Sequence, residues 1–210
     1  MRFKRRCFVF FLLVVYSGLY GQTITISDTT GQFRKLNTIS RKYLGVDLQS
    51  PFDSIIYKVY NNPELAIDTT IAHSDSSAFY VRAYHKTFNP FTIALDSVRL
   101  IIAEIRRFDS KTKAAIDTVF YLQTEGIAVG ETQIKNIRPK FYSVNKEMES
   151  SAWHSNYGKT KVKKELTAES FTYYSPLYRT PIANITWKRI SDDKAVIVVT
   201  LELHLQHSSY

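Results

Sequence analysis

The stretch KAVIVVTLELHLQ, residues 194–206, decides the fold because its side chains alternate in character. Successive side chains of a β-strand point to opposite faces, so this alternation predicts a strand with one wholly apolar face. The apolar face consists of Ala195, Ile197, Val199, Leu201, Leu203 and Leu205. The other face grows polar toward its end and consists of Val196, Val198, Thr200, Glu202, His204 and Gln206. A strand this long needs partners along its whole length.

The chain upstream supplies candidate partners, most of them in pairs joined by short polar turns. Further strands are predicted at residues 65–72, 78–86, 98–108, 115–124 and 182–190. Short turns imply antiparallel pairs, because parallel pairs need long crossover connections. The strand at residues 98–108 is apolar on both faces, which is typical of a central strand. The final strand, lying at the end of the chain, is also a candidate sheet edge for a second subunit.

The clearest helix signal lies at residues 52–60. Ser50 suits the N-cap, Pro51 suits the first helical position, and Asp53 suits the positive end of the helix dipole. Asn61-Asn62-Pro63 ends the helix.

Other parts of the chain are less regular. The sequence favours a short strand at residues 23–26, a strand at 138–144 and a helix that begins in 145–152. Residues 159–171 fit either a helix, with Lys161, Glu165 and Glu169 spaced to pair, or a strand. Residues 29–49 have no assignable pattern.

Together these patterns predict a single antiparallel β-rich domain over residues 22–210. The expected fold class is mainly β: a sandwich or strongly bent sheet built from hairpins, with one or two short helices. An α+β arrangement, with a helix packed on an antiparallel sheet, is the alternative.

The first 21 residues have the composition of a secretory signal peptide. Four cations, Arg2, Lys4, Arg5 and Arg6, precede an apolar run at residues 7–16, and small residues follow. This run is well short of the roughly 20 residues that cross a bilayer, although an uncleaved anchor is the competing interpretation. We therefore expect export to the periplasm, the outer surface or the medium, with no transmembrane span after cleavage. The single cysteine, Cys7, lies inside the signal, so the mature chain has no disulfide.

The net charge is a weak guide to partners. The whole chain carries +9, and removal of the signal peptide, with its four cations and no acid, leaves +5. Such mild basicity in an exported protein does not favour nucleic acid as a partner.

No catalytic motif or phosphate-binding glycine loop occurs in the sequence, and no cofactor is expected. Glu202 and His204 project from one face of the last strand, where they are either two ligands of a metal site or an ordinary solvent-facing pair. A hydrolase that uses Asp or Glu with His stays open, because the spatial separation of such groups is hidden in a sequence.

Tyrosines and cations concentrate between residues 153 and 178. Aromatic rings beside cations can bind a sugar chain, an anionic polymer or a partner protein. The candidate binding residues are Trp153, His154, Tyr157, Lys161, Lys163, Tyr173, Tyr174 and Tyr178. The alternative is that the tyrosines fill strand positions, for which they have high propensity.

Seven of the ten aspartates are followed directly by Ser or Thr. In five cases an Ile, Val or Thr comes next, a pattern that resembles the O-glycosylation sequon of exported Bacteroidota proteins. The resemblance implies sugar attachment at Thr29, Ser54, Thr69, Ser97 and Thr118. Turn and cap formation by Asp-Ser and Asp-Thr is the alternative explanation.

The function expected from these observations is that of an exported, non-catalytic envelope or secreted protein. Its partner is a protein or an envelope component, and it either binds that partner or assembles with other subunits. A glycan- or small-ligand-binding β domain is the alternative.

Overall fold

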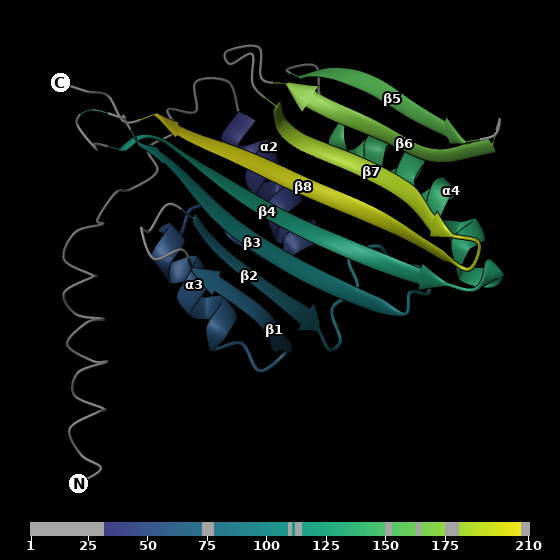
Figure 1. The fold of residues 1–210 in the computed structure, drawn as a ribbon, viewed down its shortest axis with the longest axis horizontal. Coiled ribbons are helices and arrows are strands. Elements are labelled where there is room, and N and C mark those ends of the chain that lie inside the picture. The colour runs from purple at the N-terminus through teal and green to yellow at the C-terminus, as the bar shows by residue number, and fades with distance from the viewer. Residues whose placement is uncertain are drawn as a thin grey trace, which may run out of the picture.

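The computed structural model describes residues 32–72, 78–108, 111, 115–149, 153–162, 165–174 and 181–206. The predicted signal peptide and the predicted strand at residues 23–26 lie outside the described residues. Eight strands form one antiparallel sheet in the order β1-β2-β3-β4-β8-β7-β6-β5 (Figure 1). The strands are β1 (Leu65–Ala72), β2 (Ala78–His85), β3 (Ser97–Phe108), β4 (Ala115–Val129), β5 (His154–Val162), β6 (Glu165–Tyr174), β7 (Pro181–Ser191) and β8 (Lys194–Gln206).

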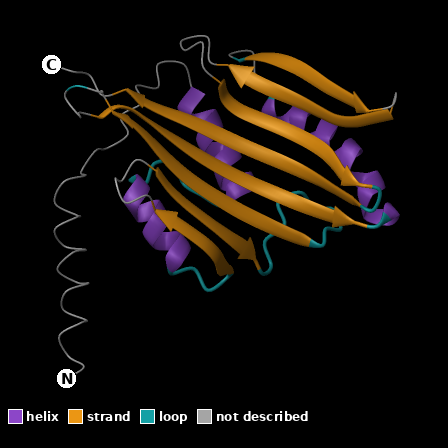
Figure 2. Cartoon of the chain, in the orientation of Figure 1, coloured by secondary structure: helices purple, strands orange, loops and turns teal. Residues whose placement is uncertain are grey.

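The helices lie on one face of this sheet (Figures 1 and 2). They are α2 (Gln32–Ile39), which continues into the π-helical turn η1 (Ser40–Leu44), α3 (Phe52–Tyr60) and α4 (Glu131–Met148). The near face in Figure 1 carries none of the described helices. The predicted mainly β, antiparallel class with helices is therefore confirmed, in the form of one sheet with helices packed on it.

The last strand has the alternation that its sequence predicts. Its side chains from Ala195 to Leu201 on the apolar face are fully buried, and Leu203 is nearly so. The sheet consists of two four-strand meanders, β1–β4 and β5–β8, that join where β8 pairs with β4. Because the chain crosses through α4 to the far edge and returns strand by strand, β8 ends in the centre. The prediction that the final strand is a sheet edge is therefore wrong.

β4 continues beyond its predicted end at residue 124, and Gly126 in this added part contacts the loop before β3. An added Cβ there would lie 2.8 Å from side-chain atoms of Phe91 and Leu95, so only glycine lets that loop pack on the strand. The strand extends to Val129 and is paired with β8 as far as that residue.

Four weakly patterned segments have different outcomes, and two of them contradict the prediction. Residues 138–144 and 145–152 were expected as a strand and a helix start, yet residues 131–148 form the single helix α4. Its buried residues, Ile137, Phe141, Val144 and Met148, recur at helical spacing. Residues 159–162 belong to β5 and residues 165–171 to β6, so of the two structures left open the strand is correct. The unassigned residues 29–49 contain α2 and η1.

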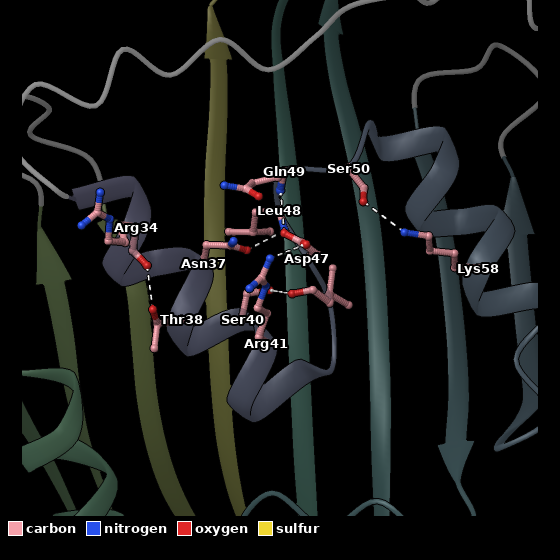
Figure 3. Close-up of polar contacts among 11 residues, drawn as sticks. Arg34, Asn37, Thr38, Ser40, Arg41, Asp47, Leu48, Gln49, Ser50 and Lys58 are labelled. Atoms are coloured by element: carbon pink, nitrogen blue, oxygen red, sulfur yellow. Dashed lines mark hydrogen bonds and ion pairs between the residues drawn. The ribbon is translucent and has the colours of Figure 1, made fainter.

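Buried polar contacts hold the link between η1 and α3 (Figure 3). Gly45, at a φ of 69°, ends η1 in the left-handed conformation. The Leu48 backbone N–H donates to Asn37 Oδ1 at 2.8 Å, and Ser40 Oγ donates to the Val46 carbonyl at 2.8 Å. Both polar side chains are buried, so these bonds remove a desolvation cost and fix the link on the sheet.

Candidate functional site

The most completely coordinated polar group on the helix side is the carboxylate of Glu169 in β6. Its side chain has no exposed surface. Arg138 of α4 donates from Nε to Oε2 at 2.6 Å, and Trp187 Nε1 of β7 donates to the same oxygen at 2.7 Å. The hydroxyls of Tyr142 and Tyr157 donate to Oε1 at 2.6 and 2.5 Å. Four residues from α4, β5 and β7 therefore meet on one buried charge.

These donors keep Glu169 ionised. Burial alone would raise the pKa of the carboxyl group, but the hydrogen bonds from Arg138, Tyr142, Tyr157 and Trp187 together lower it to about 2. The same contact raises the pKa of the Tyr157 hydroxyl, because losing its proton would break the bond to Glu169. The carboxylate is thus a fixed acceptor and has no proton to exchange at neutral pH.

The side chains that donate to Glu169 expose their other parts to solvent. Tyr142 is 40% exposed, Tyr157 is 47% exposed, and the Arg138 side chain is 52% exposed. Phe171 lies between them, with ring centroids 5.1 Å from Tyr157 and 5.4 Å from the buried Phe141. We call Arg138, Tyr142, Tyr157 and Phe171 the aromatic surface. It offers rigid rings and a cation at the junction of α4 with the β5–β6 edge.

The structure divides the predicted binding residues among different environments. Trp153 and Tyr173 are buried, with their rings in edge contact at 5.9 Å, and the Tyr173 hydroxyl donates to Asn145 Oδ1. His154 and Lys161 are exposed on β5, and Tyr174 is half-buried. Lys163 and Tyr178 lie outside the described residues. Tyr157 alone among the predicted residues belongs to the aromatic surface.

Sequence reasoning missed Arg138, Tyr142 and Trp187. Its helical alternative for residues 159–171 spaced Glu169 to pair with Lys161 or Glu165, whereas the cation bound to Glu169 is Arg138, 31 residues away. The residues that contact Glu169 come from three other elements, so no local spacing indicates them. The helical recurrence of buried residues in α4 was the available signal, since it places Arg138 and Tyr142 one turn apart.

The opposite face of the sheet carries a row of polar side chains, one from each strand but β3, where the row is interrupted. The register aligns Thr69, Arg82, Gln123, Thr200, Asn184, Thr172 and Asn156, with Ile101 of β3 between Arg82 and Gln123. We call these seven residues the polar row. Asn184 donates to Thr172 Oγ1 at 2.8 Å, Thr200 donates to Gln123 at 3.3 Å, and Arg82 donates to Thr69 at 3.1 Å.

The two residues considered as metal ligands contact each other on this face. His204 Nε2 lies 2.7 Å from Glu202 Oε1. Across the described part of the chain, no three His, Cys, Asp or Glu side chains lie close enough together to hold a metal ion.

The predicted glycosylation residues have unequal access to solvent. Ser54, Thr69 and Ser97 are half-buried, Thr118 is 5% exposed on the central strand β4, and Thr29 lies outside the described residues. A sugar on Thr118 would have to displace packed neighbours, so the folded chain disfavours attachment there.

Within the described residues, no helix has both the length and the apolar composition that crossing a bilayer requires. Comparison with protein-family models, with curated proteins and with solved structures gave no match for this chain.

Proposed function

We propose that this chain is an exported, non-catalytic envelope or secreted domain that binds a protein partner through its aromatic surface. The composition of residues 1–21 supports export. The observation that carries the binding role is the arrangement around Glu169, where one buried charge holds two exposed tyrosines and an exposed arginine.

Such an arrangement suits an interface for energetic reasons. Tyrosine and arginine are the residues that most often contribute large binding energies at protein interfaces. Binding also costs the rotamer freedom of each immobilised side chain, about 0.5–1.5 kcal/mol per flexible residue. Tyr142, Tyr157 and Arg138 are already fixed by Glu169, so they lose little of that freedom when a partner docks.

The test is site-specific photo-crosslinking in the producing cells. A photo-reactive phenylalanine analogue is placed at position 142 or 157, and at position 57 as the matched control, since Tyr57 on α3 is 69% exposed. We expect a discrete crosslinked product at the first two positions and none at position 57, with migration of the native protein in a complex larger than the chain. A monomeric native protein without products at 142 and 157 would refute the proposal.

A second candidate function, glycan binding, is favoured by the polar row. Amide, hydroxyl and guanidinium groups spaced one strand apart, about 4.8 Å, present donors and acceptors that match the hydroxyls of a sugar chain. Tyr80, Tyr84 and Tyr121 flank the row on the same face and offer rings for stacking. A rise in melting temperature with one glycan of a broad panel, lost in Asn184→Ala but kept in Tyr157→Ala, would favour this function over the first.

A further inference from the structure

The outer edge of β5 differs from an ordinary solvent-facing strand in its charge. Within the described residues, β5 pairs only with β6 and ends the sheet, and every residue of β5 except Gly158 is exposed. The strand contains Lys159, Lys161 and His154 but no Asp or Glu. An edge of this kind presents backbone N–H and C=O groups that an added strand can use.

The lysines of this edge have no partner among the described residues. Lys159 lies in register with Glu169, but the carboxylate of Glu169 is already bound by Arg138 and the two tyrosines. Lys161 lies opposite Leu166, which has no charge to offer. Two cations therefore lie on the edge strand, whose outward backbone N–H and C=O groups pair with no other described strand. The same strand contributes Tyr157 to the aromatic surface.

The opposite edge strand, β1, is also largely exposed, but its charge is engaged and its backbone is irregular. At β1, the acid Asp68 is paired with Arg82 of the neighbouring strand. Tyr60 of α3 reaches over β1, and its hydroxyl lies 3.0 Å from Thr70 Oγ1. β1 also shifts register between Ile67 and Thr69, and such a bulge discourages pairing with a further strand.

We infer that β5 accepts an extended acidic segment of a partner protein as a ninth strand, a conclusion that rests on the proposed partner-binding role of the aromatic surface. Acidic side chains of the added strand pair with Lys159 and Lys161, while an apolar side chain two positions away packs on Tyr157. Directly opposite unlike charges stabilise strand pairs, and like charges destabilise them. The lysines thus oppose pairing of β5 with β5 of a second copy, and β1 of a second copy has its acid already engaged.

The test uses the full chain and a labelled ten-residue peptide with Thr at every second position. The positions between carry two Glu, for Lys159 and Lys161, flanked on both sides by Val, for Tyr157. Binding is followed by fluorescence anisotropy, and amide hydrogen exchange reports on β5. We expect saturable binding, slower exchange at β5 amides, and at least tenfold weaker binding after Lys159→Glu with Lys161→Glu. A matched control, Lys58→Glu with Lys188→Glu, makes the same change in net charge on α3 and β7 and should leave the affinity within twofold.

Two control peptides decide whether a strand is added. The same peptide with N-methyl groups on its backbone amides lacks ladder donors on both edges. The same peptide with Lys in place of Glu has the opposite charge, and neither should bind. No binding of the acidic peptide at about 1 mM, or equal binding of the N-methylated peptide, overturns the inference. Crosslinked products at positions 142 and 157 in that case would leave the proposed function standing, so the two failures are distinguishable.

Discussion

His85 in the first half of the sheet and Glu169 in the second are both titratable side chains with buried polar atoms, but their surroundings are opposite. In the first half, both ring nitrogens of His85 on β2 are buried, and neither has a hydrogen-bond partner among the described residues. The ring instead packs on Phe88, with centroids 4.8 Å apart. In the second half, Glu169 is fully buried and accepts hydrogen bonds from four residues.

His85 and Glu169 differ in charge, and only the charged side chain needs donors held in a fixed geometry. Burial lowers the pKa of His85 from 6.5 to about 4, so this side chain is a neutral ring that fills space. Glu169 is charged, and a buried charge is tolerated only with complete coordination. Its donors are therefore held in one geometry, and that geometry faces solvent. This asymmetry places the candidate binding surface in the second half of the sheet.

The largest expected effect comes from neutralising Glu169. Glu169→Gln removes the charge that four donors share and leaves Trp187 Nε1 and Arg138 without a full partner. We expect a loss of about 3 kcal/mol in the free energy of unfolding, measured by urea denaturation. Glu165→Gln on the same strand changes an exposed acid and should stay within about 0.5 kcal/mol. Equal effects of the two substitutions would show that the contacts of Glu169 contribute nothing special.

His85 and Glu169 should each make the free energy of unfolding depend on pH, over two separate pH ranges. The folded pKa of His85 lies below its unfolded value of 6.5, so the unfolded chain binds more protons and stability falls as pH drops from 6.5 toward 4. The folded pKa of Glu169 lies below its unfolded value of 4.5, so its contribution is present above 4.5 and is lost as pH falls toward 2. Each window should cost of the order of 2 to 3 kcal/mol.

These windows are checked by measuring the free energy of unfolding at each pH for the unsubstituted chain, for Glu169→Gln and for His85→Leu. Glu169→Gln should remove the lower window alone, and His85→Leu should remove the upper window alone. An unchanged profile in either variant would assign that window to other groups.

The last strand, α4 and the contacts of Glu169 show how much of the structure the sequence predicts. The alternation in residues 194–206 predicted the strand and its buried face, because period-two burial is a local pattern. It did not predict the central position of β8, because the order of strands depends on the whole chain. α4 was missed because Arg138-Pro139 lies inside it, and the residue before a proline disfavours the helical conformation. Glu169 and the residues that bind it lie on four elements, and only tertiary packing brings them together.

Removing one donor from Glu169 should have a smaller effect than removing the acceptor. Tyr157→Phe keeps the ring on Phe171 and leaves the carboxylate three donor residues. We expect a loss of about 1.5 kcal/mol, at the low end for a bond to a charged group because Tyr157 is half exposed. Acid unfolding should also shift to higher pH, because fewer donors raise the folded pKa of Glu169. A loss as large as that of Glu169→Gln would mean that this one hydroxyl holds the cluster together.

The smallest effect, with the opposite sign, should come from His85. His85→Leu replaces a ring whose two buried nitrogens lack partners with an apolar side chain of similar size. Burying an unpaired polar group is unfavourable, so the substitution should raise the free energy of unfolding at pH 7 by about 1 kcal/mol. His154→Leu, on the exposed edge strand β5, is the control and should leave stability unchanged. A loss of stability in His85→Leu would indicate that the ring does have a polar partner, and the contrast between the two halves would then fail.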